Sequence, residues 1–484
     1  MFFSCEDNIE FFKQKLNNNF DVVHKYINNK QIGVLYLKTI VDEELLAFVI
    51  LNKLQNQNVN SLKKIQENIV GTADAKIISS SEPNFAKTVC SEALSGKVLI
   101  FMEGKNQVLA VDAKKTPARS PTEPPSSAVI LGPRIGFTEN LDNNIALIRK
   151  YLPTEDLVIK EFTVGKYTKT KVLVTFINSI ANAKTAKAIC KKIQKINIDG
   201  IIDSNYILAY FQKNNLLFKR CGLSEKPDIV TAKLLEGRVA ILVDNSPVVL
   251  TLPFFIFEDV QNSNDYYSNS VYASFLRIIR LVGVFIAAVL PGLYLSLRLY
   301  HYKVLPLQFL ITISNTTEGL PFTPFLEMLF ILLLFQILYD VSLRLPQHLG
   351  LATSIVGALI LGQTGVSAGL ISPPAVVIVA MSIISVYTIS DQIAQLSILR
   401  LIFLIIGGSV GYLGVLGFLI YTINQLARME QYGTSYLAPY APLHRSDLKD
   451  GIFKQPVFNM KKRPTSLKNT NKIRENTNLS EVKK

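Results

Sequence analysis

A stretch of 46 residues, from 345 to 390, contains no Asp, Glu, Lys or Arg, and it lies inside an apolar region that begins at Leu281. This run is too long for one helix and sufficient for two helices joined in or near a bilayer, since one membrane-spanning helix takes about 20 apolar residues. The sequence therefore excludes a wholly soluble protein and predicts an all-α polytopic transmembrane domain over residues 266–430.

We expect about four spans in this domain. Uncharged or nearly uncharged runs at 281–297 and 325–343 predict the first two, and the last falls within 401–427. The segment 301–322 is apolar only in part and short, so it is expected to lie at the membrane interface or to re-enter the bilayer.

The two ends of the chain are expected on the same side of the membrane. The N-terminus lacks the features of a signal peptide. The tail, 431–484, is basic: from Arg428 onward the chain carries 12 basic and 5 acidic side chains, half of the net charge of +14. The positive-inside rule places this tail in the cytoplasm, so the number of crossings must be even.

Glycine and proline interrupt the uncharged stretch. Irregular backbone at membrane depth is tolerated only where protein buries it or water lines it. A pore-forming or site-forming element and a plain extracytoplasmic turn both explain the break. The candidate pore or gate residues come from the polar segment before the second span and from this break. They are Glu318, Pro321, Pro324, Gly362, Gly365, Val366, Gly369 and Pro373.

Charged residues and a row of glycines mark the predicted spans. Glu327, Asp340 and Arg344 are candidate intramembrane charges, and the last two have the spacing of a mutual i,i+4 ion pair. Small residues let helices approach closely, either within the chain or between subunits, and a pore-facing stripe is the alternative. The candidate packing glycines are Gly407, Gly408, Gly411, Gly414 and Gly417.

The first 265 residues predict an α/β soluble region of two similar tandem modules. A strand–turn–strand pattern at 96–111 recurs at 237–252, and a strand followed by a helix N-cap at 34–42 recurs at 174–182. Chance similarity between amphipathic strands is the alternative. The predicted domains are a first cytoplasmic module (1–112), a proline-rich linker (113–128), a second cytoplasmic module (129–265), the transmembrane domain (266–430) and the basic tail (431–484).

Residues for catalysis or for cofactor and metal binding are missing from the soluble half. It has no phosphate-binding GxxxxGK[ST] loop and no HExxH, and its only histidine is His24. The four cysteines are far apart and are expected to be free thiols. We therefore expect no enzyme, no cofactor and, without a recognition fold, no nucleic-acid partner.

Several segments resemble a known family. They are Leu131–Glu139 with Asn144–Arg149, Lys226–Asp228 with Leu234–Val243, Glu318–Phe322, Leu343–Gly350 with Ser354–Gly362, Ala368–Pro373 and Tyr436–Pro442. In these residues the chain resembles the A subunit of the GerA-type nutrient receptors of spore germination. Many members have Glu and Arg in the second span, where this chain has Gln336 and Tyr339.

The resemblance implies a multi-pass protein of the inner spore membrane, with the N-terminal region and the tail on the cytoplasmic (spore core) side. It also implies a homo-oligomeric ring, such as a pentamer, that forms a nutrient-gated monovalent cation channel. Expected partners are a transporter-like B subunit, a lipoprotein C subunit and membrane lipid, with the nutrient bound directly or indirectly. The alternatives are a membrane-tethered scaffold or a transporter-like component without its own pore.

Overall fold

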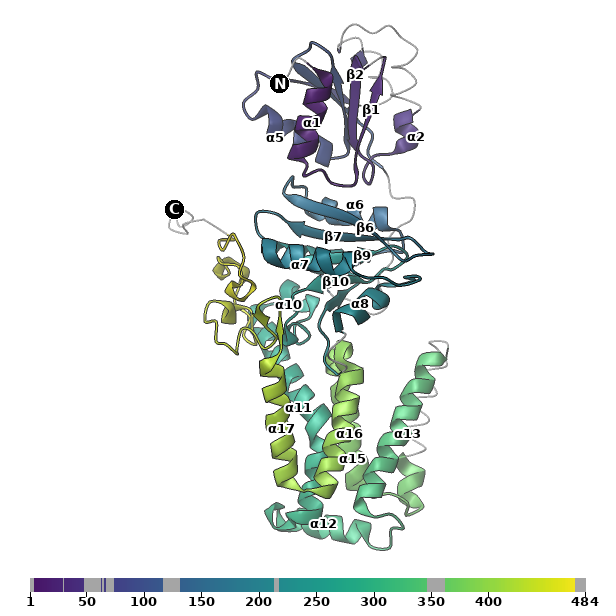
Figure 1. The fold of residues 1–484 in the computed structure, drawn as a ribbon. Helices are drawn as coiled ribbons and strands as arrows, with labels where there is room; N and C mark the ends of the chain where they lie inside the picture. Colours follow the sequence, from purple (N-terminus) through teal and green to yellow (C-terminus); the bar gives the residue numbers. More distant parts are fainter. Residues whose placement is uncertain are drawn as a thin grey trace.

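The computed structural model describes residues 4–28, 30–47, 62, 65–66, 74–115, 131–212, 217–345 and 362–474. Figure 1 shows two sheet-containing units stacked above a bundle of helices, with the C-terminal segment beside the second unit. Of the predicted linker, 113–128, only the first three residues are described.

The first unit is an antiparallel five-stranded sheet with helices on both faces. Its strand order is β1-β2-β4-β5-β3. Successive side chains of β2 and β4 point to opposite faces of the sheet, as they do along any β-strand. Leu35 and Leu99 pack with α1 and α5, whereas Val34 and Ile100 pack toward α2. The bounds are α1 (Cys5–Lys15), β1 (Val22–Ile27), β2 (Ile32–Leu37), α2 (Glu43–Leu45), β3 (Ala75–Ser79), α5 (Phe85–Leu94), β4 (Lys97–Met102) and β5 (Gln107–Asp112).

The second unit has an antiparallel sheet of order β6-β7-β9-β10-β8, in which corresponding strands have the same places as in the first. Helices α6 and α9 cover one face of this sheet, and α7 and α8 cover the other. The bounds are α6 (Leu141–Tyr151), β6 (Leu157–Val164), β7 (Thr170–Ile177), α7 (Ala183–Gln194), α8 (Ser204–Gln212), β8 (Gly222–Ser224), α9 (Pro227–Leu235), β9 (Val239–Val243) and β10 (Val249–Leu252).

The predicted local elements of both units are confirmed. β4–β5 and β9–β10 are antiparallel neighbours joined by short turns. Asp42 accepts from the amides of Glu44 and Leu45, and Asn182 accepts from the amide of Lys184, so both act as N-caps. The N-terminal region is therefore α/β, as expected.

Side chains of the first unit bind the edge strand of the second. The amide of Asn19 donates to Leu157 O (2.8 Å) and its oxygen accepts from Ile159 N (2.7 Å), as a neighbouring strand would. Beside it, Arg149 makes two 2.9 Å hydrogen bonds to Asp21, and both side chains are buried. Polar contacts thus fix the two units to each other.

The C-terminal half is helical. The bounds are α10 (Ser263–Tyr267), α11 (Ser270–Tyr300), α12 (Leu307–Thr317), α13 (Pro324–Arg344), α15 (Pro373–Val386), α16 (Ile393–Ser409) and α17 (Tyr412–Arg428). Helix α11 packs against α15, α16 and α17, and α12 lies across the end of the bundle that is far from the sheets (Figure 1). Among the described residues, α11 and the Pro324–Ser342 part of α13 are long and apolar enough to cross a membrane.

The predicted single span within 401–427 is wrong. The structure has two helices there, α16 and α17, which turn back on each other at Gly411. Gly411 has a φ of +81°, a conformation that favours glycine, and the ring of Tyr300 fills the space where a Cβ would lie. The apolar pattern continues through this turn, so hydropathy alone did not separate the two helices.

The tail folds against the second unit as far as residue 474. Asn182 donates to Lys468 O (3.1 Å), Thr470 N donates to Ile180 O (3.1 Å) and Arg463 Nε donates to Leu235 O (2.9 Å). The tail is thus attached both to the end of α17 and to the outer helices of the second sheet.

Candidate functional site

Lys219 lies where the second unit, the helical bundle and the tail meet. Its Nζ is 3.1 Å from Asp259 Oδ1 and 3.2 Å from Asp391 Oδ2, and only 3% of its side chain is exposed. Gln392 donates to the other oxygen of Asp259 (2.8 Å), and Tyr436 of the tail donates to Lys219 O (2.6 Å). We call Lys219, Asp259, Asp391 and Gln392 the junction.

The junction joins elements that are distant in the sequence. Lys219 lies between α8 and β8, whereas Asp391 and Gln392 end the short helix η4 (Tyr387–Gln392) that links α15 to α16. Burial by itself lowers the pKa of Lys219, but Asp259 and Asp391 outweigh it and raise that pKa above its ordinary value. The amine is therefore a stable cation between two carboxylates.

Glu258, the neighbour of Asp259, contacts the sheet unit. Its carboxylate pairs with Arg238 of the second unit and lies 3.0 Å from Lys233 Nζ. Burial raises the pKa of Glu258, but the two cations outweigh it and hold its pKa below the ordinary value. Glu258 ends the short helix η2 (Ile256–Glu258) and thus binds the sheet unit. Asp259, the residue after it, belongs to the junction.

A second cluster clamps the start of α11. Asp265 is fully buried and accepts from Arg277 Nε (3.1 Å) and from both terminal nitrogens of Arg280 (2.8 and 3.0 Å). Arg277 also donates to Asp450 of the tail (3.0 Å), and Lys454 donates to Asp265 O (2.6 Å). These charge-assisted bonds hold α10, α11 and the tail together.

A cavity of about 240 Å³ adjoins these clusters, between the second unit, α10 and the tail. More acidic than basic side chains line it. The acids are Asp228, Glu236, Glu258, Asp259, Asp391 and Asp450, and the bases are Lys233, Arg238 and Arg474. Within the described residues, no group of three His, Cys, Asp or Glu side chains is arranged to hold a metal ion. All four cysteines are buried free thiols, as expected.

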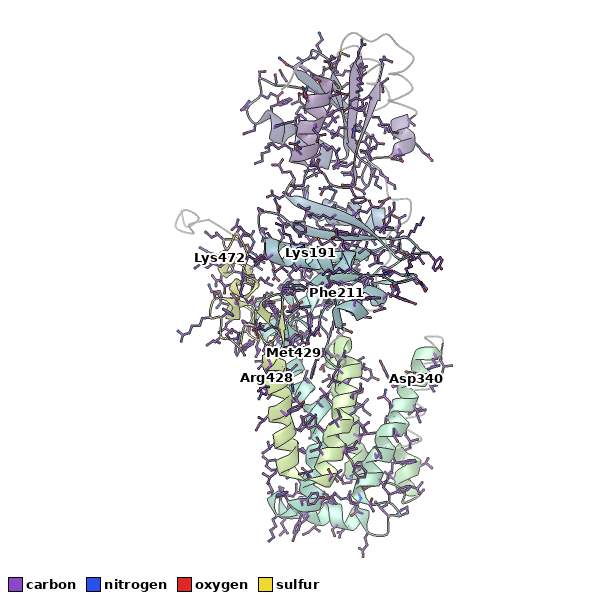
Figure 2. The ribbon with its side chains drawn as sticks, in the orientation of Figure 1. Lys191, Phe211, Asp340, Arg428, Met429 and Lys472 are labelled. Carbon is purple, nitrogen blue, oxygen red and sulfur yellow. The ribbon has the colours of Figure 1, made fainter. Side chains whose placement is uncertain are left out.

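Glu327 is the candidate charge that the structure buries completely. It accepts from Arg298 Nη1 (2.9 Å) at the end of α11, and from the backbone and side chain of Ser372 before α15. This contact ties three segments at the end of the bundle far from the sheets. Asp340 and Arg344 form their predicted i,i+4 pair (3.1 Å), but both are exposed. Figure 2 shows Asp340 toward the end of α13 that faces the soluble region.

The candidate pore and gate residues lie in two loops and the helices beside them. Glu318 and Pro321 are exposed between α12 and α13, and Pro324 is the first residue of α13. Gly362, Gly365 and Val366 lie in a helical segment that ends at Ser367, and Pro373 begins α15. The break between these helical segments therefore covers residues 368–372, and Gly369, with a φ of +63°, lies within it.

The candidate packing glycines have different surroundings. A Cβ at Gly407 would overlap the carbonyl oxygen of Gly292 on α11, so α16 and α11 touch backbone to backbone there. Gly408 lies against Phe325 and Leu295, and Gly414 lies against Val410 of its own hairpin. A Cβ at Gly417 would meet no described atom within 4 Å. One continuous stripe on a single helix is therefore not present.

Sequence reasoning missed both charged clusters. Arg277, Arg280 and Asp391 flank apolar runs, which is the one local signal that marked them. Their partners carry no pattern that predicts a partner in the bundle: Lys219 and Asp259 lie between regular elements, and Asp265 lies in the five-residue helix α10.

Residues 10–466 match a family described as "Bacillus/Clostridium GerA spore germination protein". Spore germination protein KA of Bacillus subtilis is 31% identical over 484 aligned positions, covering 98% of this chain and 88% of that protein. The uncharacterized membrane protein YfkQ of the same species is 33% identical, covering 78% and 74%. The crystal structure of the N-terminal domain of the A subunit of the Bacillus megaterium spore germinant receptor GerK3 has a TM-score of 0.40 and 28% identity. It covers 52% of this chain and 95% of that domain.

Proposed function

The chain belongs to the GerA family of Bacillus/Clostridium spore germination proteins, and from this premise we propose that it is the A subunit of a nutrient receptor in the inner spore membrane. In this proposal the chain forms a ring of several copies, together with B and C subunits. The helical bundles of the ring form a monovalent cation channel, and nutrient binding in the receptor opens it.

The path of the chain supports a multi-pass arrangement. Helix α11 enters the bundle next to α10, and α17 leaves it into a tail that binds the second unit, so both ends of the bundle lie at the soluble region (Figure 1). This agrees with an even number of crossings. Helices α16 and α17 have 17 residues each, or roughly 25 Å at 1.5 Å per residue, which is a little less than the thickness of the hydrocarbon core.

The junction is the feature that supports control of the bundle by the soluble region. Nutrient binding can open a channel only if it favours the open state, which requires a contact that differs between the two states. Lys219 makes such a contact feasible, because it binds Asp259 beside the sheet unit and Asp391 in the bundle at the same time. A shift of the sheet unit by a few ångströms would break or remake these ion pairs.

We propose that the gate lies at the far end of the bundle, near Val366 and the loop that contains Pro321. Glu327 joins the three segments there through Arg298 and Ser372. Val366 packs in the apolar core of the same end. An uncharged constriction can close a pore by excluding water, so no ring of charges is needed. The two similar sheets would be tandem modules that relay the state of the B and C subunits.

Two measurements test this function. The detergent-corrected mass of the purified chain, obtained by light scattering, should show a defined ring, alone or with the partner subunits. Spores that carry the gate variant Val366→Ala or Pro321→Ser should then release potassium without nutrient or fail to respond to nutrient. A strict monomer in the presence of all partners would contradict the channel. Unaltered germination in both variants would contradict the gate assignment.

A further inference from the structure

Arg400 is a buried cation in the helical bundle. Its residue is 5% exposed, and Nη1 donates to Ser382 Oγ at 3.4 Å. Over the ranges that the structure describes, no carboxylate lies within 4 Å of its guanidinium, in contrast to Arg277, Arg280 and Arg298, which each contact an acid. A charge held among apolar residues needs an anionic or strongly polar partner.

Arg400 also lines a half-open groove of about 660 Å³ between α13 and α16. Its other lining residues include the acid Asp391 and two larger groups. Hydrogen-bonding groups come from Gln336, Tyr339, Gln395 and Ser397, and apolar side chains come from Leu332, Leu333, Ile398 and Leu401. Leu333 and Ile398 are about half exposed, 51% and 49%, so none of the other apolar side chains that the structure describes covers them fully.

These properties fit one chemical class of ligand. A guanidinium forms paired hydrogen bonds to a phosphate, and amide and hydroxyl groups can donate to its remaining oxygens. The exposed Leu333 and Ile398 would be covered by an apolar chain. A small free anion would satisfy Arg400 but leave these side chains uncovered, whereas a phospholipid satisfies both.

We propose that the groove between α13 and α16 binds an anionic phospholipid of the cytoplasmic leaflet, with its phosphate at Arg400 and an acyl chain along Leu333 and Ile398. This inference rests on the proposed membrane location and not on channel activity. Arg400 is seven residues beyond the start of α16, or roughly 10 Å, and α16 begins at the end of the bundle that faces the sheet units.

The site adjoins the junction. Asp391, which binds Lys219, also lines the groove. A bound lipid would hold α13 and α16 in a fixed relation beside the contact that links the bundle to the soluble region. The lipid would thus set how readily a shift of the sheet unit passes through the junction to the bundle.

The test uses the full-length chain in detergent, titrated with phosphatidylglycerol or phosphatidylcholine and analysed by native mass spectrometry. We expect about tenfold tighter binding of phosphatidylglycerol, because the choline cation of phosphatidylcholine offsets the charge of the phosphate that Arg400 would bind. Arg400→Gln should remove this preference and Arg400→Lys should keep part of it. Arg428→Gln, at an exposed site at the end of α17 (Figure 2), should leave it unchanged. Ser397→Phe should weaken binding by filling the groove while Arg400 is intact.

Two controls separate the other occupants. Soluble glycerol phosphate should not compete with the lipid; equal competition would assign the groove to a free anion and overturn the proposal. A disulfide-linked dimer through Ser397→Cys that excludes lipid would assign it to a second copy and would also overturn it. Failure of the chain to enter liposomes contradicts the proposed function, whereas insertion without a preference that depends on Arg400 contradicts only this inference.

Discussion

Lys219 and Asp391 are 172 residues apart in the sequence, and Lys219 Nζ lies 3.2 Å from Asp391 Oδ2. One belongs to the second sheet unit and the other to the turn between α15 and α16, so the contact joins the soluble region directly to the bundle. Asp259 binds the same lysine, and its neighbour Glu258 binds the sheet unit. Four charged groups therefore connect the sheet to the helices through one short segment.

The close approach of α11 and α16 predicts opposite effects for two glycine variants. Gly407→Ala puts a Cβ into the carbonyl of Gly292 and should destabilise the bundle by about 1–3 kcal/mol, because backbone cannot move aside cheaply. Gly417→Ala meets nothing within 4 Å and should stabilise its helix by about 1 kcal/mol. Thermal unfolding followed by circular dichroism measures both. Equal effects would contradict the packing described for Gly407.

The buried pair between the two sheet units predicts a strong coupling. Arg149→Met leaves Asp21 buried without its cation and should cost about 3–5 kcal/mol. Adding Asp21→Leu should recover part of that loss, since the uncompensated charge is then gone. Hydrogen exchange of β1, β2 and α6 in the full chain reports the change. Additive effects of the two substitutions would mean that the side chains do not interact.

The clamp on α11 predicts sensitivity to acid. Burial raises the pKa of Asp265, but hydrogen bonds from Arg280, Asn262 and Arg277 outweigh it and hold that pKa below its ordinary value. An acid with a lowered pKa stabilises the fold above its ordinary pKa, and this contribution is lost as the pH falls through the lowered value. Proteolysis of the tail should therefore accelerate as the pH drops below the ordinary pKa of an aspartate, about 3.9.

Asp265→Asn is the matched variant for this clamp. It should loosen the tail already at neutral pH and reduce the further effect of acid. An unchanged acid response in Asp265→Asn would show that other carboxylates control the docking of the tail.

Glu327 predicts a role in holding the far end of the bundle closed. Glu327→Gln keeps an acceptor for Ser372 but removes the charge that Arg298 needs, so spores should leak potassium without nutrient. Asp340→Asn is a matched control on the same helix, because its pair with Arg344 is exposed and worth no more than about 1 kcal/mol. Leakage from both variants alike would point to general damage of α13.

Local patterns in the sequence predicted much of the soluble region. Strands and helix N-termini depend mainly on neighbouring residues. The structure has strands where the sequence alternates, at 96–111 and 237–252, and helices that begin after the capping residues Asp42 and Asn182. The turn at Gly411 was missed, because the residues on both sides are equally apolar and glycine is also common inside membrane helices.

The long-range polar contacts could not be predicted in this way. The pairing of Lys219 with Asp391, or of Asp21 with Arg149, depends on how distant segments pack, and one sequence contains no signal for that choice. Asp340 and Arg344 were easier, since their partners are one helical turn apart. The buried role of Glu327 depends in turn on Arg298 and on the loop at Ser372.

Nutrient-triggered potassium release from spores that carry Asp391→Asn tests the central claim most directly. The side chain of Asp391 is 51% exposed and Lys219 retains Asp259, so folding should change by less than about 1 kcal/mol while the ion pair between Lys219 and the bundle is lost. We predict spores with normal amounts of the receptor that no longer release potassium on nutrient addition, whereas Asp340→Asn spores respond normally. Normal release from Asp391→Asn spores would contradict control of the bundle through this contact.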